Sequence, residues 1–419
     1  MEDFYIQSIE EALSALGYDI VIMALPRWDS KYSSTAFSLA KALARHTRVF
    51  YVDNPYTYKD YARQRHSEPI ARRKQALLYG KQPVTQPLRD HPNFYAVTPR
   101  LIMPINWLPP GWLYERLSKV NDAIVYKALE QMLNTFQVKN FVFINFFNPL
   151  FGKYFPNGFK PALSVYYSVD DISQSDYISK HGVAREREAV SDAGLTLVTS
   201  TELQRLNARA AKRIMLLPNA ADVGNFLQTQ TRVFDKPNEL RFIAPGTKII
   251  LYMGNICHRL DYALLVSVAK GHPDKVLVMI GPLAFQRYKE FGLDKLPNVI
   301  FTGSKQLTEL PAYLQHAHVC LIPFLRNQLT RSIYPLKINE YLASGKPVVT
   351  TGFSEDINNF KDVVYIGDSE NEFMALITKA IDEDTEQKRL ARIAVAEGNN
   401  WDQRAQTLVS TLHTEFALA

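Results

Sequence analysis

Residues 334–351, YPLKINEYLASGKPVVTT, constrain the fold more than any other stretch of the chain. Pro335 follows a polar loop, and a proline at the first helical position has its φ preset and loses no hydrogen bond there. Gly345 suits the residue after a helix end, and Pro347 prevents the helix from continuing. The apolar run at 348–351 indicates a buried strand. The sequence therefore predicts a short helix beginning at Pro335 and a strand directly after it.

This predicted helix has two unlike faces. At roughly 100° per residue, Ile338 and Leu342 share an arc that would pack against the protein. The opposite arc carries Lys337, Glu340, Tyr341 and Ser344. The unpaired N–H groups at the helix start, together with Lys337, suit a phosphate group. Glu340 lies about 7 Å along the axis and could accept hydrogen bonds from ribose hydroxyls. A nucleotide site fits this pattern, and an ordinary surface helix with a Lys–Glu pair is the alternative.

Short apolar runs recur along the chain and indicate buried parallel strands. In the first half they cover residues 19–25, 48–52, 141–146, 162–169, 195–199 and 214–217. The pattern restarts with residues 249–253, 275–280, 298–302, 319–324, 348–351 and 363–366. Strands that alternate with helices in two halves predict an α/β protein with two doubly wound, Rossmann-like domains. The first turn lacks G-x-G-x-x-G, which argues against a dinucleotide cofactor.

Composition narrows the class of protein. With 47% hydrophobic and 21% charged residues, the chain is typical of a globular protein. A net charge of +6 and a pI near 9.0 favour anionic partners such as nucleotide or lipid phosphates, and we predict no nucleic-acid partner. Two cysteines, Cys257 and Cys320, indicate a reduced compartment. The amphipathic start, with helical spacing from Ile6 to Leu16, is not a signal peptide, and no apolar run has membrane-spanning length. We therefore predict a cytoplasmic protein.

Basic and aromatic residues gather in the first half of the chain. Residues 58–82 are rich in Arg and Lys, and residues 101–113, LIMPINWLPPGWL, are apolar, aromatic and interrupted by prolines. If Trp107 and Trp112 are exposed beside these cations, the surface would suit anionic lipid headgroups at the inner face of the cell membrane. The alternative is that the aromatic residues fill the core and the Arg-rich run is a solvated helix.

The motif PLKINEYLASGKPVV resembles the donor-site helix of bacterial glycosyltransferases of the GT-B fold, in the retaining branch. That branch commonly carries two Glu residues with seven residues between them. Glu340 matches the second, which in the family holds the nucleotide ribose, and Ser332 stands in place of the first. The resemblance implies two Rossmann-like domains that face a cleft.

The segment LPNAAD at 217–222 resembles the family's interdomain connection. The predicted organisation is an acceptor domain at 1–220, a connection at 221–245, a nucleotide-sugar domain at 246–400 and a final helix at 401–419. By analogy with the family, this last helix crosses back to the first domain.

The resemblance also implies site residues. Arg259 matches the cation that contacts the donor diphosphate, and Lys337 would help it to stabilise the leaving group. The other donor-binding candidates are Gly254, Asn255, Gly281, Pro282, Tyr334, Pro335, Leu336 and Glu340. Asn255 replaces the family's more usual Arg. Candidates on the acceptor side are Arg27, Trp28, Ser30, Asp170 and Asp171. The two aspartates follow a predicted strand, and capping of the next segment is the alternative for them.

The expected reaction moves a sugar from a UDP- or GDP-type donor to a hydroxyl of a glycan or polyprenyl-linked acceptor, in cell-surface polysaccharide synthesis. The resemblance implies retention of configuration, no metal and no cofactor. One alternative is a sugar-nucleotide 2-epimerase of the same fold. Another is a non-catalytic partner that binds nucleotide sugars, an alternative that Ser332 keeps open.

Overall fold

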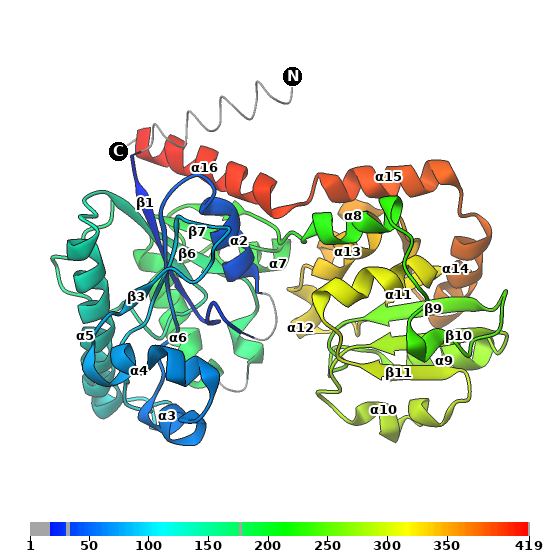
Figure 1. The fold of residues 1–419 in the computed structure, drawn as a ribbon, viewed down its shortest axis with the longest axis horizontal. Helices are drawn as coiled ribbons and strands as arrows, with labels where there is room; N and C mark the ends of the chain where they lie inside the picture. The colour runs from blue at the N-terminus through cyan, green and yellow to red at the C-terminus, as the bar shows by residue number, and fades with distance from the viewer. Residues whose placement is uncertain (1–16, 31–33, 176–177, 418–419) are drawn as a thin grey trace. The chain divides into compact units, whose positions relative to one another are not determined.

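A computed structural model describes residues 17–30, 34–175 and 178–417 (Figure 1). Two compact units form the chain. The first comprises Met1–Pro218 and Arg404–Ala419, and the second comprises Asn219–Gln403. The predicted N-terminal helix, which would end at Leu16, lies outside the described residues.

The first unit is built on a sheet in the order β3-β4-β2-β1-β5-β6-β7-β8. Its strands are β1 (Asp19–Ala24), β2 (Val49–Val52), β3 (Val84–Thr85), β4 (Phe94–Val97), β5 (Phe141–Phe146), β6 (Leu163–Ser168), β7 (Leu195–Val198) and β8 (Ile214–Leu216). All pairs are parallel except β3 with β4. Every residue of β1 is buried, as expected for a strand covered on both faces. Strand order reverses between β1 and β5, and ligands of open α/β sheets bind at such a point.

Helices of the first unit follow the strands. They are α2 (Thr35–Leu43), α3 (Tyr58–Gln64), α4 (Glu68–Tyr79), α5 (Trp112–Thr135), α6 (Ser179–Asp192) and α7 (Thr201–Asn207). Local capping explains several starts. The Ser34 side chain accepts a hydrogen bond from Phe37 N at 3.2 Å, and Thr57 and Asp60 cap each other at the start of α3. The final helix, α16 (Trp401–Ala417), begins in the second unit, and its residues from Arg404 belong to the first.

The second unit contains a six-stranded sheet in the order β11-β10-β9-β12-β13-β14, and all its pairs are parallel. The strands are β9 (Lys248–Met253), β10 (Lys275–Ile280), β11 (Val299–Gly303), β12 (Val319–Ile322), β13 (Val348–Thr351) and β14 (Tyr365–Gly367). This is the Rossmann order, with its switch point between β9 and β12. A ligand of this unit is therefore expected beyond the carboxyl ends of these two strands.

Helices of the second unit are α8 (Val223–Thr231), α9 (Tyr262–Gly271), α10 (Arg287–Glu290), α11 (Leu310–His316), α12 (Gln328–Arg331), α13 (Leu336–Ala343), α14 (Glu370–Asp382) and α15 (Glu386–Glu397). The charged stretch at residues 372–396 is not one continuous helix. Two helices occupy this stretch because Thr385 caps the second of them, accepting a hydrogen bond from Lys388 N at 3.3 Å.

Helix α13 begins one residue later than predicted and ends where predicted. Pro335 has an extended ψ of 111° and is the N-cap, so Leu336 is the first helical residue. At the other end Gly345 has a φ of +68°. Its N–H donates to Leu342 O at 2.9 Å, and Lys346 N donates to Tyr341 O at 3.1 Å. These two bonds form a Schellman motif, which satisfies carbonyls at the helix end.

The prediction that Tyr341 and Ser344 lie on the polar face of α13 is wrong, because both are buried. Tyr341 Oη accepts a hydrogen bond from Met253 N at 2.8 Å and lies 3.3 Å from Met253 O, to which it donates. Met253 is the last residue of β9. The tyrosine therefore fixes α13 against the end of the strand at the switch point.

Candidate functional site

Two glycines shape the backbone at the switch point of the second unit. Gly254 follows β9 with a φ of +141°, and Gly281 follows β10 with a φ of +144°. Gly254 N donates to Ile280 O at 2.8 Å. A Cβ on Gly281 would lie 1.9 Å from Gly254 O, so a side chain there has no room. The two loops also meet at the next residue, where the carbonyl of Pro282 accepts a hydrogen bond from Ile256 N at 3.0 Å. The bare backbone lets a phosphate approach closely.

Lys337, in the first turn of α13, crosses directly over Gly254. Its Cε lies 1.8 Å from the position that a Cβ of Gly254 would take, so the glycine makes the space that the lysine fills. The Lys337 side chain is partly exposed, and its Nζ lies 5.9 Å from the centre of the Phe324 ring. Burial lowers the pKa of Lys337, while the nearby Glu340 raises it. An ammonium group therefore sits at the carboxyl end of β9 in a poorly hydrated place.

Arg259 supplies a second cation in the loop after β9. Its Nε is buried and has no hydrogen-bond partner among the described residues. The positive charge of Arg259 also lowers the pKa of Lys337, so the two cations act on each other. A buried donor left unpaired costs free energy unless a ligand or water satisfies it. The start of α13 adds N–H groups that have no partner within the helix. Together these groups would suit an anion.

Glu340 lies one turn beyond Lys337 on the same helix. Its side chain is partly exposed, and burial raises the pKa of this carboxyl group to about 7, against the opposing effect of Lys337. The group is therefore close to half ionised at neutral pH. Hydrogen bonds donated by a ligand would favour its carboxylate form.

Other predicted donor-side residues have structural partners. Tyr334 is buried, and its hydroxyl lies 3.2 Å from Asn339 Nδ2, which donates to it. Asn255 is exposed, and its carbonyl accepts from Tyr252 Oη at 3.0 Å. Ser332 is buried and donates to Leu329 O at 2.8 Å, at the end of α12. The serine that replaces the family's first acid therefore ends a short helix.

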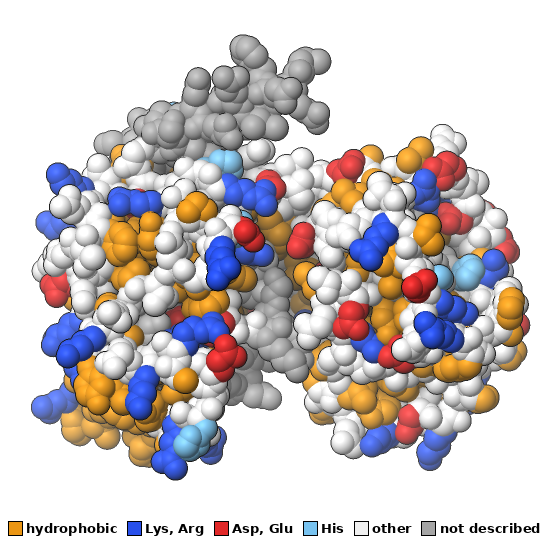
Figure 2. Space-filling model, in the orientation of Figure 1, with side chains coloured by type: hydrophobic (Ala, Val, Ile, Leu, Met, Phe, Trp, Pro, Cys, Tyr) orange, Lys and Arg blue, Asp and Glu red, His pale blue; other side chains and the backbone are white. Residues whose placement is uncertain are grey.

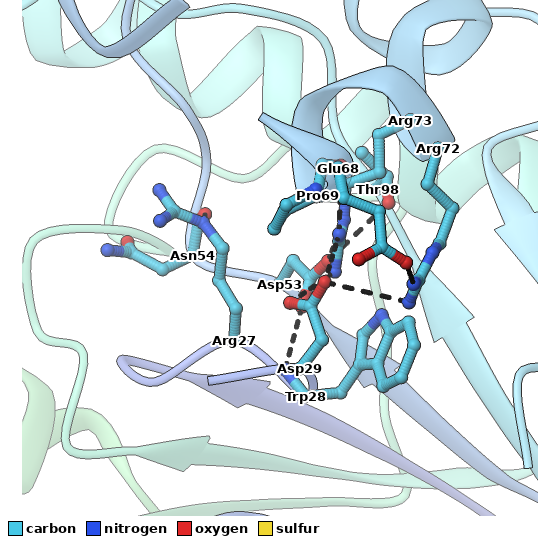
Figure 3. Close-up of polar contacts among 10 residues, drawn as sticks. All are labelled: Arg27, Trp28, Asp29, Asp53, Asn54, Glu68, Pro69, Arg72, Arg73 and Thr98. Carbon is cyan, nitrogen blue, oxygen red and sulfur yellow. Dashed lines mark hydrogen bonds and ion pairs between the residues drawn. The ribbon is translucent and has the colours of Figure 1, made fainter. Parts of the chain in front are cut away.

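A buried charge network fixes the loop after β1 in the first unit (Figure 3). Arg73 of α4 donates to both oxygens of Asp29, at 2.6 and 2.8 Å, and its Nε donates to Asp53 Oδ2 at 2.9 Å. Asp53 is fully buried and also accepts from Trp28 N at 3.2 Å. Arg73 was predicted to belong to the exposed basic run, and this is wrong for a residue only 5% exposed. The sequence analysis missed this network because Arg73 lies 20 and 44 residues from its partners Asp53 and Asp29.

The predicted acceptor-side residues of this loop lie around the network. Arg27 lies beside Asn54 (Figure 3), and its Nε donates to Asn54 O at 2.9 Å. Its guanidinium lies 3.4 Å from the centre of the Tyr56 ring. The Trp28 ring lies 5.3 Å from the guanidinium of Arg73. Ser30 is exposed, and its N–H donates to Arg27 O at 3.1 Å. The loop is a preformed turn with Arg27 and Trp28 partly exposed.

The two aspartates after β6 differ. Asp171 is buried and accepts from Ser173 N at 3.0 Å and from Ser173 Oγ at 2.6 Å, so it caps the turn that follows. Capping therefore accounts for this carboxylate. Asp170 is partly exposed at the carboxyl end of the sheet, two residues after β6 ends at Ser168. Of the pair, Asp170 is the better candidate for contact with a ligand.

A family model for glycosyl transferases group 1 matches residues 247–383. The matched region begins just before β9 and contains the glycines, both cations and α13. The matched region, residues 247–383, is called the group 1 domain below. Every donor-side residue predicted from the sequence lies within this group 1 domain, whereas the acceptor-side residues lie before it.

The chain is similar to a curated protein of Bacillus subtilis (strain 168) that is named "Putative teichuronic acid biosynthesis glycosyltransferase TuaH". It is 29% identical over 159 residues, which are 37% of this chain and 40% of the relative. The match thus spans well under half of that relative's length. The predicted resemblance to GT-B glycosyltransferases is confirmed by the family and this relative together.

Solved structures resemble the chain over nearly its full length. Sucrose-phosphate synthase from Thermosynechococcus elongatus has a TM-score of 0.67 and 14% identity, covering 96% of this chain and 100% of that one. Anabaena Alr3699/HepE in complex with UDP and glucose has a TM-score of 0.59 and 13% identity, covering 94% and 98%. At such identities the likeness shows the fold. The predicted α/β class with two parallel-sheet domains of GT-B type is confirmed.

Replacing Arg73 by Ala should lower the free energy of unfolding of the first unit by about 3–5 kcal/mol, because it leaves two carboxylates near each other with one of them fully buried. Arg72 is the control, since its side chain is 43% exposed and pairs with the exposed Glu68. Arg72→Ala should cost less than about 1 kcal/mol. Calorimetric unfolding of the full chain measures both, and equal effects would show that the buried network contributes little.

Gly254→Ala should weaken binding of a nucleoside diphosphate by about tenfold or more, because the new methyl group displaces Lys337 and strains the backbone. Gly246→Ala is the matched control, since Gly246 also has a positive φ of +85° but nothing within 4 Å of the position that a Cβ would take. Titration calorimetry gives both affinities. If Gly254→Ala binds as tightly as Gly246→Ala, the position of Lys337 over Gly254 does not contribute to binding.

Proposed function

We propose that the protein is a glycosyltransferase that moves a sugar from a nucleotide-sugar donor to an acceptor hydroxyl. Two features at the switch point of the group 1 domain carry this proposal. Lys337 lies over Gly254, and the buried Nε of Arg259 has no hydrogen-bond partner among the described residues. In the described part of the chain these two cations form no ion pair with a carboxylate, and beside a glycine-lined backbone they suit a diphosphate.

In this reaction the diphosphate is the leaving group. Arg259, Lys337 and the N–H groups of Leu336 and its neighbours at the start of α13 would stabilise the charge that develops on it. This protein-based stabilisation would operate without a metal ion. Glu340 would accept hydrogen bonds from the ribose hydroxyls, and Gly281 and Pro282 would line the nucleobase pocket. We further propose retention of the anomeric configuration, as in the branch whose motif residues 335–349 resemble.

For the substrates, we propose a UDP- or GDP-type donor and an acceptor on a glycan or polyprenyl carrier, in cell-surface polysaccharide synthesis. The name of the Bacillus subtilis relative refers to teichuronic acid biosynthesis, and the Anabaena structure holds UDP and glucose. Both support this choice of substrates. Asp170, with Arg27 and Trp28, would contact the acceptor in the first unit.

A nucleotide-sugar screen by thermal shift tests the proposal, because a ligand that binds the native state raises its melting temperature. We expect one UDP- or GDP-sugar to stabilise the full chain, and its sugar to be transferred when a glycan or lipid-linked acceptor is added. Conversion of the donor to its C2 epimer without acceptor would indicate an epimerase instead. Binding without turnover across the acceptor panel would indicate a non-catalytic partner. No stabilisation by any nucleotide sugar would contradict the proposal.

Glu340 gives donor binding a pH dependence with a defined sign. Its pKa of about 7 in the free protein should fall when ribose hydroxyls donate to the carboxylate, so binding releases a proton. Donor affinity should therefore rise between pH 6 and pH 8, by up to about tenfold. Glu340→Gln, which has no titrating group, should bind more weakly at pH 8 and lose this dependence. Calorimetry at both pH values measures these affinities. If the variant keeps the pH dependence of the wild type, Glu340 does not bind the ribose.

We also propose that the first unit contacts an anionic membrane surface. Trp107 and Trp112 are 73% and 74% exposed, so the alternative that they fill the core is wrong. Over the end of this unit where α3 and α4 lie, hydrophobic side chains are interspersed with Lys and Arg (Figure 2). Hydrogen bonds hold the loop that contains Trp107 in place. Lys180 Nζ donates to Trp107 O at 2.8 Å. The Asn121 side chain accepts from Met103 N and donates to Met103 O, both at 3.0 Å. None of the described helices is both long and apolar enough to cross a bilayer.

Vesicle sedimentation tests this contact. The full chain should bind phosphatidylglycerol vesicles at low salt, because cations near the surface attract anionic headgroups, and aromatic rings favour the interface. A Trp107→Ser, Trp112→Ser double variant should lose about tenfold in binding. Leu390→Ser on α15, also an exposed apolar residue, is the control and should bind normally. Absence of binding to anionic vesicles by the wild type would contradict the contact.

A further inference from the structure

A polar cavity of about 420 Å³ opens at the amino ends of three neighbouring strands of the second unit. Lys248 is the first residue of β9, His318 directly precedes β12, and Lys346 lies two residues before β13. The other residues that line the cavity are Gln315, His316, Ala317, Ile381 and Asp384. The six residues of β9 rise about 3.3 Å each, so about 20 Å separates this cavity from the donor-side residues beyond the carboxyl end of the strand.

The lining of this cavity carries more positive than negative charge. Neither Lys248 nor Lys346 forms an ion pair in the part of the chain that the structure describes, whereas Asp384 pairs with Arg392. Lys346 Nζ donates to Gln315 O at 3.0 Å, which uses one of its three N–H groups. Burial lowers the pKa of Lys346, so its ammonium group is poorly hydrated. An anion in the cavity would therefore stabilise two cations.

His318 adds an N–H donor whose position is fixed by β9. Its backbone N–H donates to Ile249 O at 2.9 Å, and its ring Nδ1 accepts from Ile249 N at 3.0 Å. Burial and the nearby Lys248 and Lys346 lower the pKa of His318 to about 4, so the ring is neutral at pH 7. Because Nδ1 accepts, the proton of the neutral ring is on Nε2. This Nε2–H group has no partner among the residues that the structure describes.

We propose that this cavity binds a phosphate group, either free phosphate or the phosphate of a phosphomonoester. Its oxygens accept hydrogen bonds from the ammonium groups of Lys248 and Lys346 and from Nε2 of His318. Phosphate suits these donors because its several oxygens can each accept a charge-assisted bond. At about 30 Å³ per water molecule, the cavity has room for more than one phosphate group, so an attached organic group also fits. The site is separate from the proposed donor site and does not depend on it.

Histidine-ring NMR of the full chain tests the proposal, because the signals of His318, assigned with His318→Gln, report on this cavity. Inorganic phosphate added near neutral pH should shift these signals with a saturable midpoint. Lys346→Gln should weaken binding about tenfold, since a bond to a poorly hydrated cation is lost. Lys248→Gln should weaken it about fivefold. Lys248 is exposed, so this variant keeps the test valid if Lys346→Gln does not fold.

Lys337→Gln is the matched control, since it removes the same charge from the same unit but beyond the carboxyl end of β9. Across about 20 Å its effect is screened, so the phosphate affinity measured at His318 should change less than about twofold. Signals of His318 that do not respond to phosphate, or that respond equally to sodium chloride at the same ionic strength, would overturn the proposal. Equal losses in Lys248→Gln and Lys337→Gln would overturn it too.

The same titration with glycerol 3-phosphate distinguishes the two sources of the phosphate group. Binding tighter than that of inorganic phosphate would indicate a phosphomonoester as the ligand, and weaker binding would indicate free phosphate. Both results support the site. Because His318 lies at the edge of the sheet opposite Lys337, the outcome is independent of whether nucleotide sugars bind the group 1 domain.

Discussion

Concentration of positive charge at the end of one strand is the constraint on which the account of this protein depends. Lys337 lies over Gly254 just beyond β9, where the glycine leaves room for it, and Arg259 in the following loop is near enough to lower the pKa of Lys337. Like charges held close in a poorly hydrated place are costly, and the unsatisfied Nε of Arg259 adds to that cost. A bound anionic ligand would offset both costs. We therefore expect the free energy of this site to fall when such a ligand binds.

The scaffold keeps this arrangement in register through a few specific bonds. Tyr341 joins α13 to the backbone of Met253, one residue before Gly254, and the Schellman motif at Gly345 caps the same, C-terminal, end of the helix. Because Tyr341 anchors α13 to β9, the positions of Lys337 and Glu340 relative to β9 are set by packing and not by flexible loops. The first unit uses a different means, a buried Arg73 between two aspartates, to fix the loop after its own first strand.

Local chemistry explains what could be predicted from the sequence. Twelve strands were found within one or two residues because each is a short apolar run bounded by turn residues, whereas β3 and β4 were not predicted. The stop of α13 followed from Gly345 and Pro347. The burial of Tyr341 could not be predicted, because its partner is the end of a strand that precedes it by many residues. Arg73 was assigned to the surface for the same reason: Asp29 and Asp53 reach it only through the fold.

The most direct test of the central claim is a crystal structure of the chain with a bound nucleoside diphosphate. Phosphate oxygens should lie about 3 Å from Lys337 Nζ and from N–H groups at the start of α13, with Arg259 Nε now paired and a Glu340 oxygen at a similar distance from the ribose hydroxyls. A diphosphate bound away from the end of β9, with Arg259 and Lys337 still unpaired, would contradict the account.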